Sequence, residues 1–146
     1  EMLKSFFKMI DVGNKAPCRR EALAAGKVIF SDAGFNELVT KGSKKGDIVP
    51  HAEIAGILGA KFTSNLLPMC HPLPLDSVHV EVKPNHETKS VDIQAFAAAH
   101  AKTGVEMEAL TAVSVSCLAV YDMCKNFDKA MRIENIHLVS KIKHEN

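Results

Sequence analysis

The sequence predicts an α+β fold, in which one antiparallel sheet carries two main helices on one face. Three observations support this prediction. Several short segments alternate between apolar and polar residues, as strands do, and two longer segments have apolar residues at helical spacing. Glycine and proline interrupt the chain only as far as Gly104, so long regular elements are expected after it. At 146 residues the chain is expected to form a single domain over residues 1–146.

The first half of the chain predicts one strand and two helical segments. The strand is expected over residues 27–31 and a short helical turn over residues 34–40. Apolar residues at helical spacing predict a helix over residues 50–65. Gly56 and Gly59 lower the intrinsic propensity of that helix, which indicates that it packs closely against a neighbour.

The second half predicts three strands and one long helix. Strands are expected over residues 77–83 and 91–99, joined by a loop over residues 84–89, and a last strand over residues 131–142. Residues 103–128 contain many β-branched side chains, but strands rarely exceed about 10 residues, so the length of this segment predicts a helix. The resulting order β, α, β, β, α, β is the ferredoxin-like, or split βαβ, pattern.

The long helix has a predicted cap and an unusual middle. Thr103 and Glu106 have the spacing of a capping box, in which the first side chain caps the helix and the second reaches back. Between residues 109 and 120 the helix is apolar almost all round, which is typical of a helix buried on more than one side. One side can pack on the sheet, and we expect a second subunit to cover the other, so the sequence predicts an oligomer.

The composition excludes several classes of protein. A net charge of +1 gives no basic field for nucleic acid, and a single tyrosine with no tryptophan offers few stacking surfaces. No apolar run reaches the roughly 20 residues of a membrane span, and the first residues do not resemble a secretory signal, so we expect a cytoplasmic protein. The four cysteines form no C-x-x-C pair, so neither a zinc ribbon nor a disulfide framework is predicted.

Residues 66–75 hold three prolines and display Cys70 beside His71 on a stiffened turn. His71 could bind a phosphate or carry a proton, because imidazoles titrate near neutral pH. The alternative is that His71 only satisfies the hydrogen bonds of the turn. A metal site is not predicted here, since zinc needs three or four converging ligands and adjacent residues rarely share one ion.

Lysines offer two candidate anion sites. The loop over residues 41–47 could place Lys45 on an anion, but it lacks the spacing of a phosphate-binding loop, and a solvated charged loop is the alternative. Lys61 falls on the apolar stripe of the helix predicted over residues 50–65. It either extends its ammonium group to solvent or forms a buried cation that would bind an anion strongly.

Carboxylates near both ends of the long helix are candidates for acid–base chemistry. Asp122 and Lys125 lie three residues apart, either as a surface ion pair or as a half-buried pair that moves protons near neutral pH. Glu108 has no evident structural role. It would lie about 21 Å from Asp122 along the helix axis at 1.5 Å per residue. One site can use both carboxylates only if two antiparallel copies of the helix overlap.

Five stretches of the sequence resemble a single family. They are KGD at 45–47, AEIAGI at 52–57, LPMCHPL at 67–73, KTGVEMEALT at 102–111 and YDMCK at 121–125. On these stretches the chain resembles the MoaC family of molybdenum cofactor biosynthesis, the cyclic pyranopterin monophosphate synthases. The resemblance runs from about residue 9 to residue 141, which is almost the whole chain.

The resemblance implies a lyase that converts 3′,8-cyclo-7,8-dihydroguanosine 5′-triphosphate to cyclic pyranopterin monophosphate and releases pyrophosphate. It implies a ferredoxin-like subunit in a homohexamer, a trimer of dimers, with active sites between subunits. Asp122 and Lys125 correspond to the family's catalytic pair. The positions that correspond to substrate-binding residues are Met69, Cys70, His71, Met107, Glu108, Lys45, Lys61 and Arg20. Neither a tightly bound cofactor nor a protein-held metal is implied, although Mg²⁺ could accompany the phosphates.

Two other classes of function are compatible with this fold, because the fold alone does not determine the activity. A small metabolite-binding module would bind a ligand without turning it over. An RNA-binding sheet is the second alternative, but residues 91–99 offer only Phe96 where a stacking pair of aromatic residues is expected.

Overall fold

The computed structural model describes residues 6–145 and contains one four-stranded sheet. Its strands are β1 (Cys18–Ile29), β2 (Ser77–Asn85), β3 (Ser90–Ala101) and β4 (Arg132–His144). They are antiparallel throughout and lie in the order β2-β3-β1-β4. This order, with the long strands β3 and β1 in the centre, confirms the predicted ferredoxin-like α+β fold.

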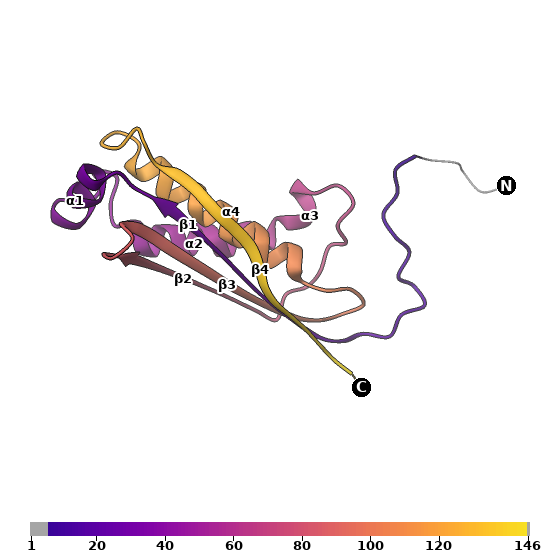
Figure 1. Cartoon of the computed structure of the whole chain (residues 1–146). Coiled ribbons are helices and arrows are strands. Elements are labelled where there is room, and N and C mark those ends of the chain that lie inside the picture. Colours follow the sequence, from indigo (N-terminus) through magenta and orange to yellow (C-terminus); the bar gives the residue numbers. More distant parts are fainter. Residues whose placement is uncertain (1–5, 146) are drawn as a thin grey trace.

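Two helices, α2 (Ile48–Lys61) and α4 (Glu106–Cys124), lie side by side on one face of the sheet (Figure 1). The shorter α1 (Asp32–Thr40) follows β1 at one end of the sheet, and a single turn, α3 (Thr63–Leu66), follows α2. The prediction of one continuous helix to residue 65 was therefore wrong, because the helix breaks at Phe62, which separates α2 from α3.

Strand β1 begins at Cys18 and is much longer than the strand predicted over residues 27–31. Residues 18–26 are mostly Arg, Glu, Ala and Leu, which favour helices, so the local pattern concealed the strand. Pairing with β3 on one side and β4 on the other overrides that preference. Alternate residues of β1 are buried beneath the helices, which places Arg20 on the helix-covered face.

Helix α4 begins at Glu106, and the predicted capping box does not form. Val105 is the residue before the first turn, and no side chain caps the helix there. The Glu106 carboxylate instead lies 3.2 Å from the Lys141 ammonium on β4, and this long-range ion pair replaces the local hydrogen bond. Helix α4 ends at Cys124, whose carbonyl accepts hydrogen bonds from the backbone amides of Phe127 and Asp128.

Close packing of α2 on α4 confirms the prediction made from the two glycines. A Cβ atom at Gly59 would lie 2.8 Å from the Val115 side chain, and one at Gly56 would lie 3.1 Å from the Ala112 carbonyl oxygen. Helix α2 therefore covers part of the surface of α4 for which a second subunit was expected. Leu118 remains 58% exposed on another side of α4.

Helix α4 is also the one element within residues 6–145 that is long and apolar enough to cross a bilayer. Half of its most apolar window is buried inside the fold, as is usual for a core helix.

Candidate active site

A cavity of about 360 Å³ opens beside the N-terminal end of α4. The proline-rich segment over residues 66–75, which precedes β2, forms one of its walls. The first turn of α4 forms a second wall. Five of the residues predicted to bind substrate line it, namely Met69, Cys70, His71, Met107 and Glu108. The fold thus brings together two stretches of sequence that are far apart in the chain.

The segment that precedes β1 forms a third wall of this cavity. Ile10, Asp11, Val12 and Lys15 line it, and the Nε2 atom of His71 lies 2.5 Å from the Ile10 carbonyl oxygen. Since a carbonyl can only accept, Nε2 carries the proton and donates it. His71 therefore contacts a distant segment rather than its own turn, and this wall lies outside the five stretches that carry the family resemblance.

Burial sets the electrostatics of the cavity. Glu108 is only 4% exposed, and desolvation raises the pKa of its carboxyl, with a smaller contribution from the charge of Glu106. Burial also raises the pKa of the Cys70 thiol, and the negative charges of Glu108 and Glu106 add to this effect. A thiol held in its neutral form is a poor nucleophile. Cys70 is thus suited to contact a ligand, not to attack it.

Glu106 is a cavity residue that the sequence analysis missed, because its spacing from Thr103 explained it as part of a capping box. Its Oε1 atom pairs with Lys141, while its Oε2 atom is buried and has no hydrogen-bond partner among the described residues. The stretch KTGVEMEALT contains both Glu106 and Glu108, and this was the available signal.

Two predicted cations lie near the cavity without lining it. Arg20 is buried, and its Nη2 atom donates to the Lys102 carbonyl at 3.3 Å, while its Nε atom has no partner among residues 6–145. Lys61 lies at the end of α2 and is exposed, so the buried-cation interpretation is wrong for the single chain. It lines a neighbouring hollow of about 350 Å³ to which Glu108 and Leu73 also contribute.

The C-terminal end of α4 carries a second cluster, formed by Asp122, Lys125 and Lys45. The Lys125 ammonium lies 2.9 Å from Asp122 Oδ1, and the Lys45 ammonium lies 3.2 Å from Asp122 Oδ2. Lys45 also donates to the main-chain carbonyl of Asp122 at 3.1 Å. The sequence indicated the Lys125 pair, which is local, but not the pairing with Lys45.

The exposure of Asp122 decides between the two alternatives in favour of a surface ion pair. The side chain is 56% exposed rather than half-buried. The hydrogen bond from Lys125, followed by that from Lys45, lowers its pKa instead of raising it toward neutrality. Two cations in open solvent stabilise the ionised form. At neutral pH this cluster therefore presents a carboxylate that can accept a proton and ammonium groups that can donate one.

One chain does not bring the two clusters together. Glu108 and Asp122 both lie on α4, as predicted, and the rise of the helix separates them by about 21 Å along the axis. Asp122, Lys125 and Lys45 do not line the cavity that holds His71 and Glu108.

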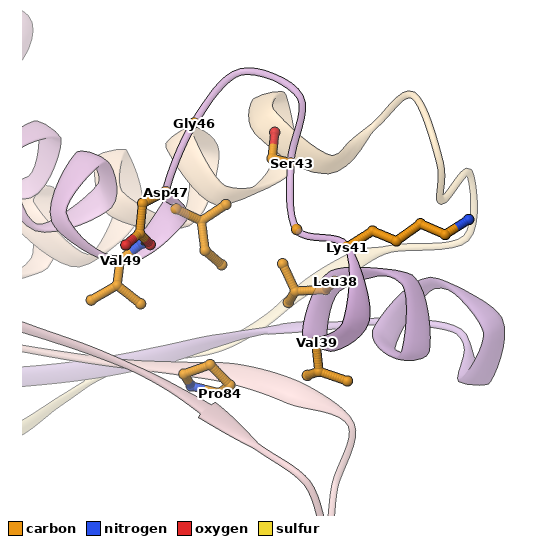
Figure 2. Close-up of a pocket in the computed structure, with 10 residues that line it drawn as sticks. Leu38, Val39, Lys41, Ser43, Gly46, Asp47, Val49 and Pro84 are labelled. Atoms are coloured by element: carbon orange, nitrogen blue, oxygen red, sulfur yellow. The ribbon is translucent and has the colours of Figure 1, made fainter.

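A further cavity of about 370 Å³ lies between α1, the loop over residues 41–47 and β2 (Figure 2). Its walls include the apolar side chains of Leu38, Val39, Val49 and Pro84, and the Lys41 side chain extends away from it (Figure 2). This lining does not suit a phosphate group, so we do not assign the cavity to the site.

Comparison with known proteins gives a consistent result. The model of the MoaC family matches residues 9–144. A relative from Nostoc sp. is 48% identical over 134 residues, which cover 92% of this chain and 80% of the relative. Relatives from Chloroflexus aggregans (46% identity, 92% and 81% covered) and Rhodospirillum rubrum (49% identity, 91% and 80% covered) are equally similar. All three bear the name cyclic pyranopterin monophosphate synthase.

Proposed function

The chain belongs to the MoaC family, and from that premise we propose that it is a lyase that makes cyclic pyranopterin monophosphate for the molybdenum cofactor. Its substrate is 3′,8-cyclo-7,8-dihydroguanosine 5′-triphosphate, and pyrophosphate is the second product. Such a substrate is made from GTP, so we place the enzyme in the cytoplasm. One observation carries the proposal. The Asp122 carboxylate lies between the ammonium groups of Lys125 and Lys45 at the C-terminal end of α4, and the N-terminal end of the same helix borders the cavity.

The residues present meet the needs of this reaction. A triphosphate requires positive charge, which Lys45, Lys61 and Arg20 supply, and we assign His71 to the same phosphates as a polar contact. Opening and closing rings requires proton transfer, which we assign to Asp122 and Lys125. Asp122 is ionised at neutral pH, so we assign it as the proton acceptor of this pair and the Lys125 ammonium as the donor. Met69, Cys70, Met107 and Glu108 surround the uncharged part of the substrate.

We propose further that each active site takes the N-terminal end of α4 from one copy and the C-terminal end from another, within a hexamer built as a trimer of dimers. The separation of Glu108 from Asp122 along one helix supports this arrangement. Lys45 then belongs to the same copy as Asp122, because the two side chains pair within one chain.

Mixing of two inactive variants tests the shared site. Asp122→Ala and His71→Ala chains should each be inactive alone. Mixed oligomers, formed by refolding the two together, should regain a fraction of wild-type activity, because some sites receive both intact ends. Continued inactivity of properly assembled mixtures would contradict a shared site.

The proposal assigns no tightly bound cofactor to the protein. Among residues 6–145 no group of three or more His, Cys, Asp and Glu side chains is placed to hold a metal ion. We propose that any Mg²⁺ accompanies the phosphates of the substrate, where it would neutralise part of their charge.

The direct test is incubation of the protein with the cyclised GTP derivative, with GTP itself as the control. Released pyrophosphate and a fluorescent oxidised pterin should appear only with the cyclised compound. A protein that binds this compound stoichiometrically but releases no pyrophosphate would instead be a metabolite-binding module, and the proposed activity would be rejected.

A further inference from the structure

Ser43 ties the loop between α1 and α2 to the C-terminal end of α4. Its hydroxyl donates to the Met123 carbonyl at 2.6 Å and accepts a hydrogen bond from the Lys45 backbone amide at 3.1 Å. Met123 is among the last four residues of α4, whose carbonyls have no partner within the helix. One hydroxyl thus connects the helix that carries Asp122 to the backbone of Lys45.

The rest of the loop leaves Lys45 with little other support. Residues 43–46 form a tight turn, closed by a hydrogen bond from the Gly46 amide to the Ser43 carbonyl at 3.2 Å. Gly42 and Gly46, with φ of 72° and 126°, let the chain enter and leave this turn. Across the described residues, the hydrogen bonds between this loop and α4 come from Ser43 and from the Lys45 ammonium itself.

A lysine in such a position needs a fixed backbone. Its four-carbon stem loses much rotational freedom when the ammonium is held in one place. An exposed ion pair, such as that between Lys45 and Asp122, gains too little to offset this loss by itself. The backbone of Lys45 must therefore already lie next to α4.

We propose that Ser43 is a positioning residue, which holds the Lys45 ammonium against Asp122 through the two hydrogen bonds of its hydroxyl. The inference rests on the proposed function, because it concerns the cluster that we assign to proton transfer. Ser43 itself does not touch Asp122 or the cavity beside Glu108.

Removal of the hydroxyl should act on Asp122 through Lys45. In Ser43→Ala the ammonium spends less time at the carboxylate, so the pKa of Asp122 should rise toward its ordinary value. The acidic limb of the pH–rate profile should move to higher pH for the same reason. We expect kcat/KM to fall roughly 3- to 10-fold, the usual effect of one such hydrogen bond. Ser43→Thr keeps the hydroxyl and should behave as wild type.

The test follows the Asp122 carboxyl by ¹³C NMR titration of the substrate-free protein. The variants are Ser43→Ala, Ser43→Thr, Ser43→Val, Lys45→Met and the Ser43→Ala/Lys45→Met double variant. Valine has the shape of threonine without the hydroxyl, so this pair decides the question if alanine disturbs the turn. Ser114→Ala is the matched control, because it removes another hydroxyl bound to a backbone carbonyl of α4, at 2.8 Å, away from Lys45.

The proposal predicts a higher pKa of Asp122 in Ser43→Ala and Ser43→Val, but not in Ser43→Thr or Ser114→Ala. It also predicts no further rise when Ser43→Ala is added to Lys45→Met. An unchanged pKa in both hydroxyl-free variants, or an undiminished rise in the absence of Lys45, would overturn it. The titration needs no substrate. Lack of turnover by the wild type would therefore reject the proposed function alone, and an unchanged titration would reject the positioning role alone.

Discussion

The two ends of α4 place carboxyl groups in opposite environments. Near the N-terminal end, Glu108 is buried, and desolvation raises its pKa. Near the C-terminal end, Asp122 is exposed, and the ammonium groups of Lys125 and Lys45 lower its pKa. The comparison shows that one helix can carry one carboxyl group with a raised pKa and another with a lowered pKa. In one chain the two acids are too far apart to serve one site, so they can form an acid–base pair only in a site shared between two copies, as proposed.

The largest effect on activity is expected from substitutions at the exposed, C-terminal end of α4. Asp122→Ala and Lys125→Ala should each reduce product formation by about 100-fold or more, because each removes a proton-transfer group. Both side chains are exposed, so the folded oligomer should persist. Pyrophosphate release measures the loss, and circular dichroism checks the fold. Near-normal product from both variants would contradict the assignment.

A third carboxylate extends the comparison. Asp128 is buried like Glu108, but both of its carboxylate oxygens accept hydrogen bonds from backbone amides. Its Oδ2 accepts from the Ser31 amide and its Oδ1 from the Ala130 amide, both at 2.9 Å. Asp128→Ala leaves both amides without this partner and should lower the free energy of unfolding by about 2 kcal/mol. Urea unfolding measures this. Asp128→Asn keeps one acceptor and should lose less, so equal losses in the two variants would argue against hydrogen bonding as the cause.

The pH dependence of stability distinguishes the two ends directly. The pKa of Glu108 is raised in the folded state. Ionisation of this side chain therefore lowers the free energy of unfolding as pH rises above 4.5, the ordinary pKa of the group. Glu108→Gln removes that loss, so the variant should gain stability relative to wild type between acidic and neutral pH. Asp122→Asn should do the opposite, because the lowered pKa of Asp122 gives stability that builds as pH rises toward the ordinary value of 3.8, is complete above it, and is absent from the variant. Urea titrations over this range measure both, and parallel curves for wild type and Glu108→Gln would be incompatible with the buried acid.

The smallest effect is expected at Lys41, which lies in the same loop as Lys45 but pairs with Glu37 on the preceding helix, α1. This exposed pair, at 3.6 Å, should be worth less than about 0.5 kcal/mol. Lys41→Met should leave both the unfolding free energy and the rate of product formation almost unchanged, whereas Lys45→Met should slow the reaction. Equal losses of rate would show that the loop contributes only its total charge.

The sequence was sufficient for the order of elements and for the local part of the site. Apolar periodicity and segment length predicted α2, α4 and three of the four strands close to their observed positions, because these signals depend on neighbours within a few residues. The Asp122–Lys125 pair was predictable for the same reason, since residues three apart on a helix are adjacent. The motifs that carry the family resemblance are local as well.

Tertiary structure decided what depends on distant partners. The first half of β1 became a strand because β3 and β4 flank it, although its residues favour a helix. Glu106 pairs with Lys141 in place of a local cap, and Lys45 reaches Asp122 from far along the chain. Burial decided the rest, because it raises the pKa of Glu108, whereas Asp122 stays in solvent beside two cations that lower its pKa. Sequence spacing reports which side chains are neighbours along one element, but the exposure and the charge around a group depend on how all the elements pack.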